Sequence, residues 1–205
     1  MRDSKTSGLQ VVTKEEKEPR VKAFIEQHIE KLEGRPDWAP VEFLLVARSP
    51  ESPVCRALSA LAPALAAQKI AVRVVFTAID TGAFQGDLAA SANLLQMATS
   101  RIVCDSRLYE AHEQLILDEE TCWIGDCMRR EPAKRDAYES YTTSSVATAH
   151  AAALTFAHLW RAGSATVPIS RFMPAIGYKE AQEAGIFSHP HADGENSPPT
   201  ALTRH

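Results

Sequence analysis

The sequence predicts an α/β fold, with a mixed sheet flanked by helices, from three observations. An apolar run at residues 41–47, an Ala- and Leu-rich stretch, and a second apolar run at 71–78 follow one another directly. Strand, helix and strand in that order predict a right-handed crossover between parallel strands. Two short apolar runs within residues 111–125 predict a hairpin, and an amphipathic stretch that ends near Arg161 predicts a last helix.

The composition is that of an ordinary globular protein: 45% of the 205 residues are hydrophobic, 23% are charged, and the net charge is -4. This charge offers no general attraction to nucleic acid or to an anionic membrane, although a local basic patch that contacts nucleic acid stays open. No apolar stretch approaches the roughly 20 residues that span a bilayer, and the first residues lack the apolar core of a signal peptide. We therefore expect a cytoplasmic protein with no transmembrane segment and with free thiols.

The first 40 residues divide into two parts. Residues 1–13 are polar and are expected to be disordered. Residues 14–40 are expected to be an amphipathic helix and a linker, because apolar side chains recur at steps of three and four until Gly34 stops the helix. The stripe consists of Val21, Phe24, Ile25, His28, Ile29 and Leu32. This helix either packs on the domain or docks on a partner.

The folded domain is expected at residues 41–165. After the first strand, Ser52 is a candidate N-cap and Pro53 a first helical residue, and the helix should run to about Lys69. Pro63 lies inside this stretch and should kink or split the helix, since proline lacks the N–H that the helix needs.

The remaining elements are shorter. They are a helix at 87–98, a third strand at 101–105 and a strand-like piece at 137–142. Thr143 or Ser144 should cap the last helix, and Gly163 should end it. Its expected apolar face consists of Val146, Ala149, Ala153, Phe156, Ala157 and Trp160. Residues 166–205 are rich in proline, glycine and polar residues and are expected to be a flexible tail.

The most unusual chemistry lies in AHEQLILDEETCWIGDCMRREP, residues 111–132. This stretch and the order of elements around it resemble the phospholipase D superfamily, and more narrowly its short members that carry one catalytic motif per chain. The family motif is His-x-Lys, four residues, Asp, six residues, then Gly-Ser-x-Asn. The flanks agree: residues 41–76 resemble the family's first strand, helix and second strand, and residues 138–160 resemble the strand and helix after the motif. The resemblance implies a phospholipase D-like sandwich.

On this resemblance, His112 takes the position of the family's histidine and Gln114 that of its lysine. Asp118 comes one residue early for the aspartate, whereas Glu119 has the right offset from His112. Asp118 keeps the six-residue spacing to Gly125, so a one-residue deletion in the strand is the simplest alignment. The segment Gly125, Asp126, Cys127 and Met128 then stands where the family has Gly-Ser-x-Asn.

The resemblance implies a histidine nucleophile, a second histidine that protonates the leaving group, and lysine and asparagine side chains that stabilise the phosphorane. Here Gln114 carries no charge and Met128 has no hydrogen-bond donor. A carboxylate such as Asp126 about 4 Å from a phosphate costs about 4 kcal/mol at a dielectric constant near 20. We therefore expect a degenerate member, a cytoplasmic binding or regulatory module with a pocket for a phosphate-bearing ligand.

A divergent phosphodiesterase, nuclease-like or phospholipase-like, is the alternative, so whether the chain is an enzyme stays open. His112 would be its nucleophile, and Arg129 or Arg130, or Arg107 before the hairpin, would supply the missing charge. A structural histidine paired with Asp118 or Glu119 is the other interpretation of His112. Because one motif copy makes half a site, the resemblance implies a homodimer that joins two His112 regions.

Metal and cofactor chemistry is weakly indicated. Cys104, Cys122, Cys127 and His112 lie in or beside the hairpin, but the paired spacing of a structural zinc site is absent. The sequence also lacks a Gly-x-Gly-x-x-Gly loop, a P-loop and a His-Glu-x-x-His motif. We expect neither a metal nor a cofactor.

Overall fold

The computed structural model describes residues 8–33, 40–77, 91–125 and 136–164. All of them belong to one compact unit, Met1–Phe172. A second unit, Met173–His205, lies outside the described residues, and so does the expected tail at 166–205.

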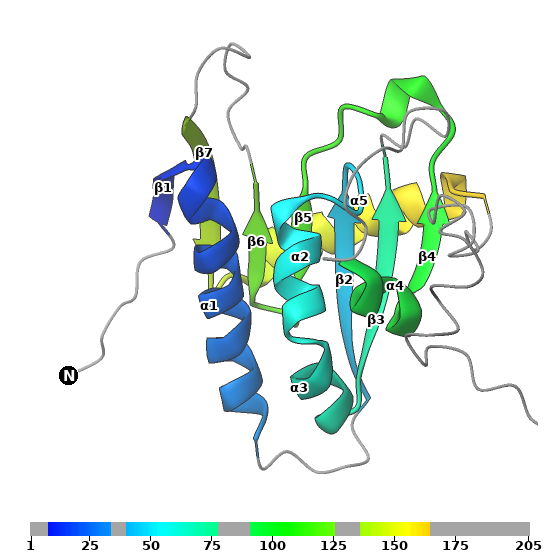
Figure 1. Ribbon diagram of the computed structural model, residues 1–205. Coiled ribbons are helices and arrows are strands. Elements are labelled where there is room, and N and C mark those ends of the chain that lie inside the picture. The colour runs from blue at the N-terminus through cyan, green and yellow to red at the C-terminus, as the bar shows by residue number, and fades with distance from the viewer. Residues whose placement is uncertain (1–7, 34–39, 78–90, 126–135, 165–205) are drawn as a thin grey trace, which may run out of the picture. The chain divides into compact units, whose positions relative to one another are not determined.

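A mixed sheet forms the centre of the fold, as the sequence predicts, and it has seven strands in the described residues (Figure 1). The strands are β1 (Gly8–Thr13), β2 (Val41–Ala47), β3 (Ile70–Phe76), β4 (Thr99–Ile102), β5 (Gln114–Ile116), β6 (Cys122–Ile124) and β7 (Asp136–Thr142). Their order in the sheet is β1-β7-β6-β5-β2-β3-β4. Strands β2, β3 and β4 are parallel, and all other neighbours are antiparallel.

Helices cover both faces of this sheet. In front of it in Figure 1 lie α1 (Lys14–Leu32), α2 (Pro53–Ala60), α3 (Ala62–Ala67) and α4 (Ala92–Met97), while α5 (Val146–Ala162) crosses behind it. Alternate strand residues feed the two cores, as the pleat requires. Phe43 and Leu45 pack on the α1/α2 side, and Val46 and Val75 pack on the α5 side.

The α1 helix belongs to the domain. Thr13 caps it through a capping box with Glu16, in which each side chain bonds to the other's backbone N–H at 3.3 Å. The helix packs against α2, β1 and β7. Its buried side chains are Val21, Phe24, Ile25, His28, Ile29 and Leu32.

The expectation of disorder over residues 1–13 is wrong for the described part of that range. Gly8–Thr13 form β1, which pairs with β7 from Gly8 opposite Tyr141 to Thr13 opposite Asp136. Val12 is buried against the domain. Local composition cannot reveal this strand, because its hydrogen-bond partners come from the far end of the domain.

The α2–α3 pair confirms the predicted break. The first helix ends at Ala60 and the second begins at Ala62, with Pro63 in its first turn, where a missing N–H costs nothing. No helix in the described ranges is long and apolar enough to cross a membrane.

Some element boundaries differ from the prediction: of the helix expected at 87–98, the described residues form α4, Ala92–Met97. Strand β4 begins at Thr99, because parallel pairing places this residue opposite Arg73 of β3. Helix α5 is capped by Ser145, whose Oγ accepts the N–H of Thr148 at 3.3 Å, so Thr143 and Ser144 lie before the cap. The predicted apolar face is correct in part: Ala149 and Phe156 are buried and Trp160 packs against the core, whereas Val146 is exposed and Ala152 and Leu159 are buried.

Candidate functional site

The predicted hairpin at residues 111–125 is present. Strands β5 and β6 are antiparallel, with Leu115 opposite Trp123. Leu115 and Trp123 belong to the core on the α1/α2 side, whereas Ile116 and Cys122 belong to the core on the α5 side. By the same alternation, Glu113 lies on the α1/α2 side and Gln114 on the α5 side.

His112 and Gln114 lie at the beginning of β5 but have different surroundings. His112 is half-buried, and its imidazole makes no hydrogen bond with any residue that the structure describes. Gln114 is buried, and its Nε2 donates to the carbonyl oxygen of Ala152 in α5 at 3.2 Å. Gln114 therefore fastens α5 to the sheet.

Asp118 lies at the opposite end of the hairpin and holds its turn. Its Oδ1 accepts the N–H groups of Glu120 at 2.8 Å and Thr121 at 2.6 Å, and its Oδ2 lies 3.7 Å from Nε2 of His28. Burial raises the pKa of the Asp118 carboxyl, but these hydrogen bonds and the nearby His28 outweigh burial and leave the pKa below its usual value.

The expected pairing of His112 with Asp118 or Glu119 is therefore not formed within the chain. At about 3.3 Å per residue, the strand separates His112 from Asp118 by about 20 Å. Glu119 is exposed in the turn at the same far end. Within this chain, neither carboxylate lies where it can orient the imidazole.

The most concentrated polar chemistry of the described residues lies on the other face of the hairpin. Lys17 of α1 reaches in, and its Nζ lies 3.1 Å from Oε2 of Glu113 and 3.3 Å from Oε1 of Glu139. The same Nζ lies 5.2 Å from the centroid of the Trp123 ring, in cation–π geometry. We call these residues, together with Ser52 and Tyr141, the Lys17 cluster.

Glu139 of β7 is fully buried in the Lys17 cluster, with a side-chain exposure of 0%. Its Oε2 accepts hydrogen bonds from Nε1 of Trp123 at 3.1 Å and from the hydroxyl of Tyr141 at 2.8 Å. Burial, followed by the charge of Glu139, raises the pKa of Tyr141, so this phenol stays a hydrogen-bond donor. Each oxygen of this carboxylate therefore faces a donor or the Lys17 ammonium.

Glu113 of the hairpin joins the segment between β2 and α2 to the cluster. Its Oε1 accepts the backbone N–H of Arg48 at 3.2 Å and the hydroxyl of Ser52. Ser52 stands at the N-cap position of α2, as predicted, but its hydroxyl is used on Glu113 and not on the helix. Burial, then the charge of Glu113, raises the pKa of the Cys55 thiol.

Gly125 closes the hairpin beside the Lys17 cluster. Its N–H donates to the carbonyl oxygen of Glu113 at 2.8 Å. A Cβ at this position would lie 2.6 Å from two carbons of the Trp123 ring and 3.4 Å from Nζ of Lys17, so only glycine fits. The next predicted site residues, Asp126, Met128, Arg129 and Arg130, lie outside the described residues.

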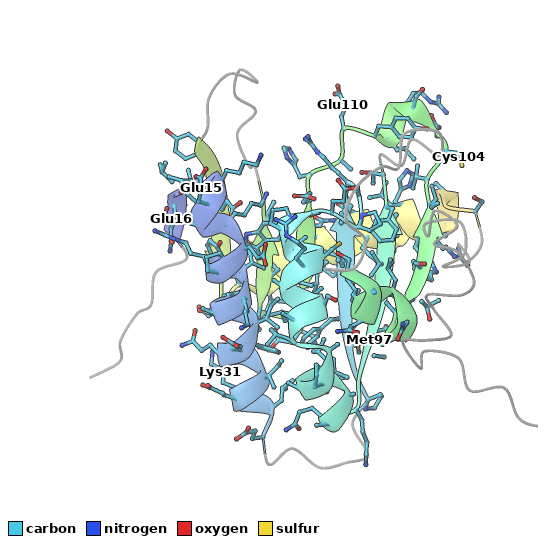
Figure 2. All side chains as sticks on the ribbon, viewed as in Figure 1. Glu15, Glu16, Lys31, Met97, Cys104 and Glu110 are labelled. Atoms are coloured by element: carbon cyan, nitrogen blue, oxygen red, sulfur yellow. The ribbon has the colours of Figure 1, made fainter. Side chains whose placement is uncertain are left out.

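Sequence reasoning missed the Lys17 cluster. Two signals could have indicated it: Trp123 in a buried strand needs an acceptor for its indole N–H, and Glu113 and Glu139 interrupt segments that are otherwise suited to burial. Figure 2 shows the acidic first turn of α1, with Glu15 and Glu16, at the same end of the domain as Glu110, whereas Lys31 lies at the other end. The cluster is thus built where α1 begins, beside the start of β5.

Metal ligands do not converge in the described part of the chain. No three of its His, Cys, Asp or Glu residues form a group that could hold a metal ion. Cys104 is exposed, Cys122 is buried, and both are free thiols.

Comparison with known proteins gives matches by structure alone. No protein-family model and no curated protein matches the sequence. The phospholipase D family member Nuc from Salmonella typhimurium matches with a TM-score of 0.50 and 16% identity, over 80% of this chain and 100% of Nuc. TrmBL2, an archaeal chromatin protein, matches with a TM-score of 0.47 and 13% identity, over 79% of this chain and 56% of its own. NucT from Helicobacter pylori matches with a TM-score of 0.46 and 11% identity, over 78% of this chain and 99% of NucT. The mixed sheet, its hairpin and the match to Nuc identify the fold of this chain as that of the phospholipase D superfamily.

Proposed function

We propose that this chain is a catalytically degenerate protein of phospholipase D fold, which acts as a cytoplasmic binding or regulatory module. The observation that carries the proposal is Gln114. The amide stands where the family motif has a lysine, is buried, and donates to the carbonyl oxygen of Ala152. A neutral side chain held by α5 cannot compensate the negative charge that develops on a transferring phosphoryl group.

Two further observations support the same conclusion. Asp118 is engaged by the hairpin turn and by His28, about 20 Å from His112 along the strand. Lys17, the ammonium that reaches the hairpin, is already neutralised by Glu113 and Glu139. Because loss of one stabilising donor lowers turnover by roughly 100- to 1,000-fold, the loss of several should abolish it. A phosphate-bearing molecule stays the expected ligand class, since the scaffold is shared.

A divergent phosphodiesterase is the second candidate, favoured by the state of His112. The imidazole is half-buried and makes no hydrogen bond among the described residues, so it is available as a nucleophile. This function would need a homodimer with two His112 imidazoles in one cleft, and a cation from Arg129 or Arg130.

Turnover of bis(p-nitrophenyl) phosphate by the full chain separates the two functions. We expect wild type, His112→Ala and the control His150→Ala, which changes an exposed histidine of α5, to show the same background rate. Turnover that is lost in His112→Ala and kept in His150→Ala would refute the proposal.

Vanadate provides an independent test, because it mimics the pentacoordinate phosphoryl group. We expect crystals soaked in vanadate to show no vanadate against the His112 imidazole. Vanadate held there by His112 and an arginine would favour the phosphodiesterase.

A further inference from the structure

The two edge strands of the sheet, β4 and β1, differ in whether another described segment pairs with them. At the β4 edge, Ser164 forms a bridge with Ile102, and its N–H donates to the carbonyl oxygen of Ile102 at 3.0 Å. At the β1 edge, the described residues provide no strand beyond β1. Among the described residues, the outer backbone groups of β1 therefore have no strand partner, as at an edge that can accept another strand.

The side chains of β1 favour such pairing. Leu9 and Val11 are 53% and 52% exposed, and alternation places them on the same face of the strand. The other face is satisfied within the domain, because Gln10 accepts a hydrogen bond from Arg20 at 3.1 Å and Val12 is buried. Strand β1 contains no charged residue and no proline, the devices by which edge strands usually resist the addition of another strand.

We propose that β1 is an interaction surface for a second copy of this chain, and that the two β1 strands pair antiparallel about a two-fold axis. A register centred on Gln10 places Leu9 of each copy beside Val11 of the other, so the apolar pair complements itself. No like charges meet along the strand. Ser164 occupies the β4 edge at Ile102, and an isologous two-fold contact between two β1 strands closes as a dimer.

This surface is independent of the motif and of the proposed function. In the sheet order, β1 is three strands away from β5. Seven strand spacings of about 4.8 Å would separate the two β5 strands of such a dimer, which is about 34 Å. The β1 dimer therefore differs from one that joins two His112 regions, and the two can be told apart by mutation.

Sedimentation equilibrium of the full chain across a range of concentrations tests the proposal. We expect a dimer that dissociates on dilution. Val11→Lys should weaken it about tenfold or more, because both copies place a charge within an apolar cross-strand pair. The control Leu154→Lys, at a residue of α5 that is 58% exposed, should leave the dissociation constant unchanged.

Two further measurements keep the test decisive. If Val11→Lys melts at a lower temperature than wild type, Val11→Thr, which suits a strand but removes the apolar contact, replaces it. Amide exchange at residues 8–13 should slow as concentration rises. A monomer at every concentration would overturn the proposal, and β1 would then be a surface for a strand of another protein. So would a dimer that Val11→Lys leaves intact and His112→Ala disrupts.

Discussion

Replacing Lys17 with methionine removes the ammonium between Glu113 and Glu139 and keeps an apolar stem of similar length. The three side chains are 13%, 11% and 0% exposed, so water cannot take over the role of the ammonium. Removing one partner of a buried ion pair typically costs about 3–5 kcal/mol, because an uncompensated charge stays buried. At about 2–4 °C per kcal/mol, we expect the melting temperature to fall by about 6–20 °C.

The pH dependence of this effect has a definite sign. Burial lowers the pKa of Lys17, but attraction by Glu113 and Glu139 outweighs burial, so the pKa is raised above 10.5 in the folded state. The stabilisation is therefore fully present below the unfolded value of 10.5 and is lost as pH rises through the folded pKa. The difference between wild type and Lys17→Met should be constant from neutral pH to about 10 and shrink above it.

Urea unfolding followed by circular dichroism provides the measurement. Lys22→Met is the matched control, since Lys22 lies on the same helix with 42% exposure and a 3.6 Å pair with Glu26. The control should change the free energy of unfolding by less than about 0.5 kcal/mol. A loss below about 1 kcal/mol for Lys17→Met would refute the view that this ammonium compensates buried charge.

Three other outcomes are expected. Gly125→Ala should cost about 1–3 kcal/mol in urea unfolding, because its Cβ would lie 2.6 Å from the Trp123 ring; an unchanged midpoint would contradict that contact. Asp118→Asn should destabilise the protein at neutral pH, and the difference should vanish as pH falls through the lowered pKa of the native carboxyl, since a depressed pKa stabilises only above the unfolded value. Unfolding measured between pH 2 and 7 checks this, and a pH-independent difference would oppose it. Iodoacetamide should alkylate the exposed Cys104 of the folded protein and spare the buried Cys55, whose pKa is raised by burial and then by the charge of Glu113. Peptide mapping of the alkylated protein checks this, and faster alkylation of Cys55 than of Cys104 would contradict it.

Much of the fold follows from local patterns. The crossover between β2 and β3, the hairpin and the break at Pro63 each depend on periodicity or on one residue's backbone chemistry. Strand β1 was not predictable in this way, because its partner β7 comes last among the strands. The face of α5 was predicted only in part: Ala149 and Phe156 are buried as expected, whereas tertiary packing buries Ala152 and Leu159 and leaves Val146 exposed.

The candidate site was less accessible from sequence. The motif resemblance identifies His112 and Gln114, but spacing along the chain cannot tell that Gln114 bonds to Ala152 or that Asp118 faces His28. The Lys17 cluster joins residues of α1, of β7 and of the segment just before β5, which are brought together only when the sheet has assembled. Such contacts depend on tertiary structure. Their only signal in the sequence is a polar residue within an otherwise apolar segment.

Strand β1 pairs with β7, so the first described strand in the sequence cannot form its ladder until the last one has been synthesised. During synthesis, α1 emerges with its apolar stripe and Lys17 long before the strand that carries Glu139. Closure across so long a loop is entropically slow, and contacts of this kind slow folding. Strand β1 and the Lys17 end of α1 therefore lack their β7 partners until that strand has been made, and this stage is open to chaperone binding or aggregation.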